Sequence, residues 1–290
     1  MSNLTNPNPK LLTRNMQLTI GHLYPKEMNI YGDMGNIITF RKRCEWRNID
    51  IDIIEIGKGY IDSENPNINA DLYFMGGGQD NDMYAVFEDL IKYKRKFLLK
   101  EVLKEKIFFL ICGAFQLFGK YFLDAQGRKI KGLNILPIET KAPSDKLSDR
   151  CLGNLASNLS PEIKTMVNNF YKSKFLRTIV GFENHSGQTY FMNNSIKPMA
   201  KVIYGKGNNA KEKIDGGVYR NIFGTYSHGS LLPKNPHIAD MIITIALQNK
   251  YRKTIELAPL DDTIEWMAHQ AFLDKITFEK KSEKFFFYQL

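Results

Sequence analysis

The chain has 290 residues, of which 43% are hydrophobic and 24% are charged, and its formal net charge is +9. This composition excludes wholesale disorder, and the length allows one large α/β domain or two small ones. Cys44, Cys112 and Cys151 lack C-x-x-C spacing, which argues against a disulfide framework or a zinc site and favours a reducing, cytoplasmic compartment.

The first half of the chain alternates between strand and helix patterns. Residues 1–16 precede this alternation and lack the apolar segment of a secretory signal, so we interpret them as a disordered N-terminal extension. Asp33 is suited to cap the first helix. We expect strands at 18–23, 49–56, 71–75 and 106–111, and helices at 33–47, 82–105 and directly after Cys112. Such alternation predicts an α/β fold with a doubly wound, mainly parallel sheet.

The second half has more strand character. We expect short strands at 130–140, 178–182, 189–191, 200–204 and 221–226, loop and helix at 141–174, and a helix at 237–249. We assign residues 17–250 to one domain and 251–290 to a helical tail with one helix at 263–273. The aromatic end, Phe285 to Tyr288, is able to pack on the body, on a partner or near the inner face of a membrane. No apolar run is long enough to cross a bilayer.

A basic stretch, Lys92-Tyr93-Lys94-Arg95-Lys96, falls within the helix expected at 82–105. We interpret it as a solvated helix face. The alternative is a site for an anionic partner, such as a phosphorylated metabolite, a membrane surface or nucleic acid. The chain carries no nucleic-acid-binding motif, so we expect no nucleic-acid partner.

An apolar, β-forming run ends at Cys112, and two small residues and a helical pattern follow it. A buried strand that turns sharply into a helix presents the turn residue at the edge of the sheet. The N–H groups at a helix start favour negative charge, which lowers the pKa of a cysteine there and makes it a nucleophile. The alternative is a buried core cysteine, which is among the commonest fates of a free cysteine.

Three glycines, Gly76 to Gly78, end the strand expected at 71–75. Ligands of open parallel sheets bind outside the carboxyl ends of the strands. Glycines there let backbone N–H groups approach a ligand and stabilise a developing oxyanion, although a tight structural turn is the alternative. Neither G-x-G-x-x-G nor G-x-x-x-x-G-K-[ST] occurs, so the sequence shows no nucleotide site.

A cysteine nucleophile needs a base, which a histidine far away in the sequence usually supplies. Of the five histidines, His228 is the first choice because it follows a strand-like run in a loop context. His185 is the second choice and His22 the third. His237 and His269 lie in helical patterns, and we interpret them as structural.

These segments resemble class I glutamine amidotransferases of the cobyric-acid-synthase-like branch. ICGAFQLFG at 111–119 resembles their nucleophile segment, GGGQD at 76–80 their oxyanion loop and FGTYSHG at 223–229 their histidine motif. YPKEMNIYGDMGN at 24–36 and IVGFENHSG at 179–187 are similar to one subgroup, the glutaminase subunits of lipid II isoglutaminyl synthases. The resemblance covers residues 18–250 and implies a flavodoxin-like sheet.

The resemblance also implies a mechanism. Cys112 attacks the side-chain amide of glutamine, and His228 transfers protons. N–H groups near Gly77, Gly78 and Gly113 stabilise the tetrahedral oxyanion. The residues implied for substrate binding are Gln79, Gln116 and Lys146.

The chain departs from the family pattern at three positions. Ser230 stands where most class I amidotransferases have a glutamate, so the acid that orients the histidine must come from elsewhere. Ala114 replaces a second glycine. Lys146 stands where the family has an arginine that holds the substrate glutamine, and Arg150 lies nearby. A lysine offers a point charge rather than a planar fork, so this change is not neutral.

The family pattern divides the reaction between two chains. It implies a Mur-ligase-like partner that holds ATP and Mg²⁺ and contacts lipid II, whereas we expect no metal and no cofactor on this chain. Our first hypothesis is a glutaminase subunit that supplies ammonia for amidation of the D-glutamate of lipid II. One alternative is a subunit serving another acceptor, such as a corrin. The other is a catalytically inactive binding subunit, which Ala114 and Lys146 favour.

Overall fold

The computed structural model describes residues 15–62, 64, 67–144, 146–170 and 177–287. Its centre is a six-stranded sheet with the order β13-β14-β4-β3-β1-β2, in which only β13 runs antiparallel to its neighbour. The strands are β1 (Gln17–Leu23), β2 (Asp50–Ile56), β3 (Leu72–Met75), β4 (Ile107–Ile111), β13 (Gly217–Tyr219) and β14 (Ile222–Thr225). This flavodoxin-like order confirms the predicted doubly wound, mainly parallel sheet.

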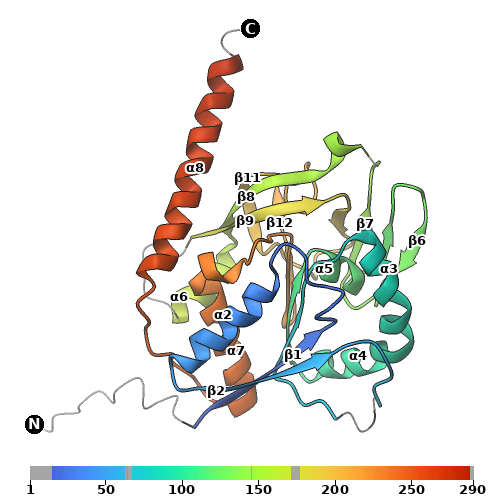
Figure 1. Cartoon of the computed structure of the whole chain (residues 1–290), viewed down its shortest axis with the longest axis vertical. Helices are drawn as coiled ribbons and strands as arrows, with labels where there is room; N and C mark the ends of the chain where they lie inside the picture. Colours follow the sequence, from blue (N-terminus) through green and yellow to red (C-terminus); the bar gives the residue numbers. More distant parts are fainter. Residues whose placement is uncertain (1–14, 63, 65–66, 145, 171–176, 288–290) are drawn as a thin grey trace, which may run out of the picture.

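Helices cover both faces of this sheet (Figure 1). One side carries α2 (Met34–Glu45) and α7 (Pro236–Tyr251). The other side carries α3 (Asp80–Asp89), α4 (Arg95–Leu103) and α5 (Gly113–Phe118). The single helix expected at 82–105 is divided, because a π-helical turn, η1 (Leu90–Lys94), separates α3 from α4.

Two four-stranded sheets are built from the second half of the chain. The first has the order β10-β7-β5-β6 and consists of β5 (Tyr121–Leu123), β6 (Lys129–Lys131), β7 (Ile138–Lys141) and β10 (Gln188–Phe191). The second has the order β12-β11-β8-β9 and consists of β8 (Cys151–Leu159), β9 (Thr178–His185), β11 (Ala200–Tyr204) and β12 (Ile214–Asp215).

The interpretation of residues 141–174 as loop and helix is wrong for β8. Its sequence, CLGNLASNL, is rich in Gly, Asn and Ser, which are poor strand formers. Antiparallel pairing with β9 along eight residue pairs nevertheless makes it a strand, because tertiary pairing overrides local propensity. Among the described residues of this region, 141–144 and 146–170, only η2 (Leu147–Asp149) and α6 (Pro161–Phe170) are helical.

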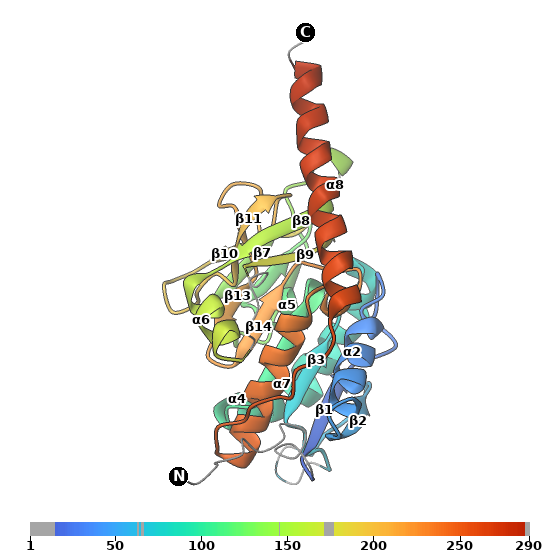
Figure 2. The ribbon, with the colours of Figure 1, turned by 90° about the vertical axis from the view of Figure 1, so that its left-hand side faces the viewer.

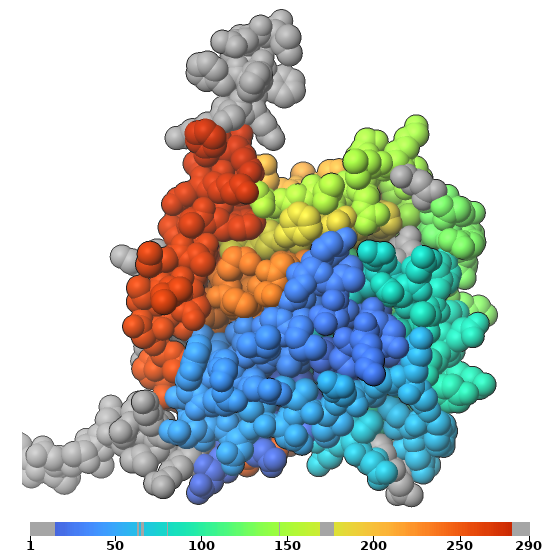
Figure 3. Space-filling model, viewed as in Figure 1, coloured from blue at the N-terminus to red at the C-terminus, as the bar shows by residue number. Residues whose placement is uncertain are grey.

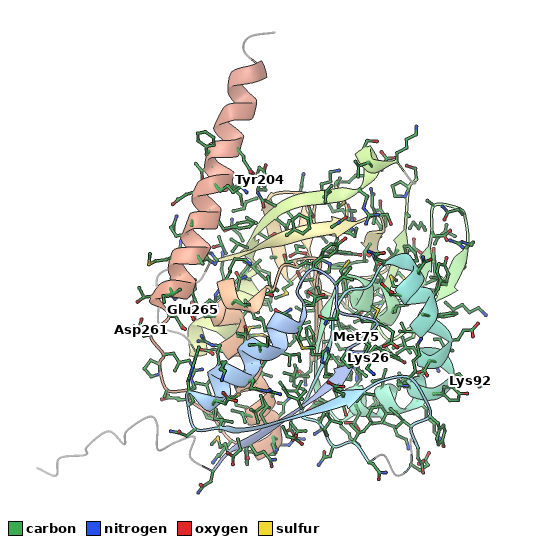
Figure 4. All side chains as sticks on the ribbon, viewed as in Figure 1. Lys26, Met75, Lys92, Tyr204, Asp261 and Glu265 are labelled. Carbon is green, nitrogen blue, oxygen red and sulfur yellow. The ribbon has the colours of Figure 1, made fainter. Side chains whose placement is uncertain are left out.

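The last helix, α8 (Thr263–Phe287), extends well past the expected end at 273 and projects from the body (Figure 2). Near its middle, Ile276 packs against Ala156 and Val180, with Tyr204 beside it (Figure 4). Tyr288 of the aromatic end lies outside the described residues. At the other end of the chain, Met16 is buried and accepts the N–H of Asp50 at 2.8 Å, so it belongs to the body.

A buried ion network fixes the root of α8. Arg43 of α2 contacts Asp240 of α7 and Asp262, the residue before α8, with N–O distances of 2.6 Å to each. Arg47 also contacts Asp240 at 2.6 Å. Charges so deeply buried are stable only when paired. Within the described part of the chain, we find no helical segment with the length and apolar character that a bilayer crossing requires.

Candidate active site

Four loops meet at the carboxyl edge of the central sheet. They follow β1, β3, β4 and β14 and carry Asp33, Gly78, Cys112 and His228 respectively. These strands are parallel neighbours, and the strand order reverses between β1 and β3, where ligands of such sheets bind. In the space-filling view, the N-terminal segment (blue), α3 (cyan) and β9 (yellow) adjoin one another on the front face (Figure 3).

Cys112 occupies the turn from β4 into α5 with φ 49° and ψ −104°. This conformation is strained for a residue with a side chain. Two hydrogen bonds hold it: the N–H of Cys112 donates to Thr225 O at 2.8 Å, and the carbonyl of Cys112 accepts from Gln116 N at 3.0 Å. The residue is 4% exposed and lines a cavity of about 260 Å³. The strand-to-helix turn therefore presents the sulfur to a ligand-sized space.

His228 and Asp33 lie side by side at this edge. Nδ1 of His228 is 3.3 Å from Oδ1 of Asp33, and both residues are fully buried. The backbone N–H of His228 donates to Phe182 O at 2.6 Å, and the Tyr31 and His228 rings pack edge to face. The acid that orients His228 thus comes from this chain itself.

The sequence predicts that Asp33 caps the first helix, and the structure confirms its position but not a capping bond. It stands at the N-cap of α2, but its side chain makes no capping hydrogen bond. It contacts His228 instead, and it accepts the N–H of Gly77 at 2.6 Å. Ser230 stands at the position of the missing family glutamate. Its hydroxyl donates to Gly32 O at 2.6 Å and so supports the loop that holds Asp33.

His228 is held in its charged form. Burial opposes the charge, but the neighbouring Cys112 sulfur and the Asp33 carboxylate outweigh burial and raise the pKa of His228 to about 10. His228 thus stands beside the Cys112 sulfur as a group that is able to give a proton. Nε2 of His228 makes no hydrogen bond of ordinary geometry within the described residues, while the ring interacts with the Cys112 side chain, so Nε2 is available to exchange a proton with the reacting groups.

Two of the three predicted oxyanion donors adjoin each other. A Cβ placed on Gly113 would lie 3.2 Å from the backbone N of Gly78, and Gly78 lines the cavity together with Cys112. The N–H of Gly77 is already given to Asp33, so Gly77 is not a free donor. The lack of a side chain at Gly77 instead lets the His228 ring pack closely against it, because a Cβ there would lie 2.4 Å from Cε1 of His228.

The far wall of the cavity is polar. Gln116 is buried, and its Nε2 donates to the Tyr226 hydroxyl at 3.0 Å. His185 stacks on Tyr226 with ring centroids 3.8 Å apart, and its Nδ1 donates to Gly187 O at 2.7 Å. Gln79 is exposed at the rim, where its backbone N–H donates to Asp82 at 3.0 Å. Both predicted glutamines therefore line the cavity.

Arg150, and not Lys146, reaches the cavity. Nε of Arg150 donates to Oδ1 of Asn184 at 2.9 Å, and Nδ2 of Asn184 donates to the Tyr31 hydroxyl at 2.6 Å. Lys146 is exposed and does not line the cavity. The short helical turn η2 separates the two basic residues, and only Arg150, the residue before β8, lines the cavity. Asn184 and Tyr31 lie in motifs that the sequence singled out, but without a role.

The remaining histidines are unsuited to act as the base. Burial lowers the pKa of His22 to about 4. His237 and His269 pack around Trp266 where α7 meets α8, as expected for structural residues. His185 lines the cavity, but its ring stacks on Tyr226 and its Nδ1 donates to Gly187 O, whereas His228 interacts with both Cys112 and Asp33. Among the residues described, no group of three or more His, Cys, Asp or Glu side chains is arranged to hold a metal ion.

Comparison of the sequence with known proteins identifies a family and several relatives. A model of the CobB/CobQ-like glutamine amidotransferase domain matches residues 19–236. The chain is 33% identical over 261 residues to the subunit GatD of lipid II isoglutaminyl synthase (glutamine-hydrolyzing) from Streptococcus pneumoniae, covering 89% of this chain and 91% of that protein. The Staphylococcus aureus subunit of the same name is 34% identical over 271 residues, covering 92% and 99%.

A solved structure shows the same fold. PurLQS from Thermotoga maritima matches with a TM-score of 0.54 at 13% identity, covering 82% of this chain and 100% of that one. At such low sequence identity, the match shows similarity of the fold alone. The family match over most of the chain confirms the resemblance inferred from the motifs at 76–80, 111–119 and 223–229. The chain belongs to the CobB/CobQ-like glutamine amidotransferase family.

Proposed function

We propose that this chain is the glutaminase subunit of a lipid II isoglutaminyl synthase. It releases ammonia from glutamine and supplies it to a Mur-ligase-like partner that amidates the D-glutamate of lipid II. The observation that carries the proposal is the assembly of Cys112, His228 and Asp33 at one sheet edge, where His228 interacts with the other two. Similarity to two GatD subunits along nearly the full length of each favours lipid II over a corrin as the acceptor.

The site geometry supports a thioester mechanism. The Cys112 thiolate attacks the carboxamide carbon of glutamine, and the N–H groups of Gly78 and Gly113 stabilise the oxyanion that forms. The His228 imidazolium gives its proton to the leaving ammonia. Neutral His228 then takes a proton from water, whose oxygen attacks the thioester and releases glutamate and the free cysteine. Loss of one oxyanion donor typically costs about 10²- to 10³-fold in kcat.

Arg150 is our choice for binding the α-carboxylate of glutamine. Its guanidinium lies at the cavity, and a planar fork matches a carboxylate with two parallel hydrogen bonds. Gln116 on the far wall and Gln79 at the rim offer further polar contacts. Lys146 is not part of this proposal, because it stands outside the cavity lining.

The second half of the reaction belongs to the partner. Activation of a carboxylate needs ATP and Mg²⁺, and this sequence carries neither the P-loop nor the dinucleotide-binding glycine motif. We therefore assign nucleotide, metal and lipid II to the Mur-ligase-like subunit. The proposal implies that the complex works in the cytoplasm at the inner face of the membrane.

The test combines this chain with its partner, ATP, Mg²⁺, glutamine and lipid II. The wild type should release glutamate and amidate lipid II, and Cys112→Ser should do neither. Cys44→Ala is the matched control, because Cys44 lies in α2 away from the cavity, and it should retain activity. If the complex released glutamate but amidated only a corrin, the proposed acceptor would be wrong and the corrin would take its place. No glutamate release by the wild-type complex would reject the glutaminase assignment.

A further inference from the structure

The basic stretch Lys92 to Lys96 is not the uniform solvated face that its sequence predicts. Lys92 and Lys96 are exposed, and Figure 4 shows Lys92 at the outer edge of the molecule. Lys94 is buried, with 0% of its side chain exposed. A buried lysine is costly unless it is paired and hydrogen-bonded, so its surroundings call for an explanation.

The π-helical turn η1 turns Lys94 inward. In an α-helix, side chains three or four residues apart are neighbours. Asp89 and Lys94 are five apart, and the i→i+5 spacing of a π-turn brings them together. Nζ of Lys94 pairs with Oδ2 of Asp89 and donates to Gly59 O at 2.7 Å. Such turns are common at functional sites.

This buried pair holds Tyr24, the first residue of the loop after β1. The hydroxyl of Tyr24 donates to Oδ2 of Asp89 at 2.7 Å, and Nζ of Lys94 lies 5.1 Å from the centre of the Tyr24 ring. Oδ1 of Asp89 accepts the N–H of Gly59 at 2.6 Å. The backbone of Tyr24 has a φ of 50° and its N–H donates to Ile56 O at 2.8 Å. Several contacts therefore hold Tyr24, where the loop begins, in a strained backbone conformation.

The loop leads from Tyr24 directly to the oxyanion hole. The N–H of Met28 donates to Tyr24 O at 2.8 Å. The Met28 side chain packs against both oxyanion peptides: its Sδ is 2.6 Å from the Cβ position of Gly78, and its Cε is 3.3 Å from that of Gly113. Farther along, the same loop presents Asp33 to His228.

We propose that Tyr24, Asp89 and Lys94 are positioning residues for glutamine hydrolysis. They fix the loop of residues 24–33 at its origin, and through Met28 they set the spacing of the Gly78 and Gly113 N–H groups. None of the three lines the cavity, so they act through the loop and not on the substrate. The inference rests on the proposed glutaminase function.

The test compares Asp89→Asn and Lys94→Met with Lys96→Met, an exposed lysine two residues farther on, whose ion pair with Glu64 is also exposed. Two rates are measured on each folded complex: steady-state glutamine hydrolysis, and alkylation of Cys112 by iodoacetamide. Alkylation displaces iodide from carbon and builds no oxyanion. We expect kcat to fall about tenfold or more in the two variants, with KM and the alkylation rate within about twofold of wild type. Lys96→Met should match wild type in both.

A parallel fall in kcat and alkylation would mean general disruption of the cysteine–histidine pair and would overturn the inference. So would a kcat within twofold of wild type in Asp89→Asn. If these variants fail to fold, Tyr24→Phe, which removes one hydroxyl, is decisive by the same two rates. Wild-type complex that hydrolyses no glutamine rejects the proposed function, and the positioning inference falls with it.

Discussion

Replacing Asp33 by asparagine tests the link between the first loop and His228, the proposed catalytic histidine. The carboxylate accepts the N–H of Gly77 at 2.6 Å and lies 3.3 Å from Nδ1 of His228. Asparagine has nearly the same shape but no charge, and it must turn an NH₂ group toward one of these two donors. A hydrogen bond to a charged group is worth about 1.5–3 kcal/mol, which corresponds to about 10- to 150-fold in rate. We expect kcat/KM for glutamine to fall within that range.

The pH profile gives this variant a second signature. Asp33 is one of the groups that raise the pKa of His228 to about 10, so its neutralisation lowers that pKa. The imidazolium that protonates ammonia is lost as the pH rises through the pKa of His228. The alkaline limb of the kcat/KM profile should therefore move to lower pH in Asp33→Asn. Glutamate release measured across the alkaline range reports both effects.

Asp52→Asn is the matched control, since Asp52 is an exposed acid of β2 on the neighbouring strand. It should leave both the rate and the profile unchanged. If Asp33→Asn kept kcat/KM within threefold of wild type with an unshifted alkaline limb, the orienting role of Asp33 would be refuted.

Three further changes probe the site and its frame. Arg150→Met should raise KM for glutamine by about tenfold, because a charge-assisted hydrogen bond to the substrate is lost. In Lys146→Met, the control, KM should stay within about twofold of wild type. Equal effects of the two changes in steady-state kinetics would contradict the cavity geometry. Gly77→Ala should lower kcat by about 100-fold, because its Cβ would lie 2.4 Å from Cε1 of His228, and a folded variant with normal turnover would disprove this packing. Asp240→Ala removes the acid shared by two buried arginines and should reduce the free energy of unfolding by about 3–5 kcal/mol in a urea titration; a loss below about 1 kcal/mol would mean that the network relaxes.

Local patterns were sufficient to place Cys112 and the glycines at 76–78 at the ends of two strands. The apolar run before Cys112 and the glycines after residue 75 mark strand ends by composition alone, and strand ends of a parallel sheet share one edge. The same reasoning failed where tertiary contacts override propensity. β8 is a strand despite its Gly, Asn and Ser residues, and Lys94 is buried despite its basic neighbours.

The sequence by itself determined the alternation of strands and helices, the turn at Cys112 and the loop position of His228, because these depend on periodicity and on residues next to one another. Only the tertiary structure decided which side chains complete the site. Asp33 lies 195 residues from His228 along the chain and meets it because β1 and β14 end at the same edge. Arg150 lines the cavity and Lys146 does not, because one short helical turn separates them, and Lys94 turns inward because of one wide turn. Strand order and irregular turns are set by packing of the whole molecule, which no local pattern encodes.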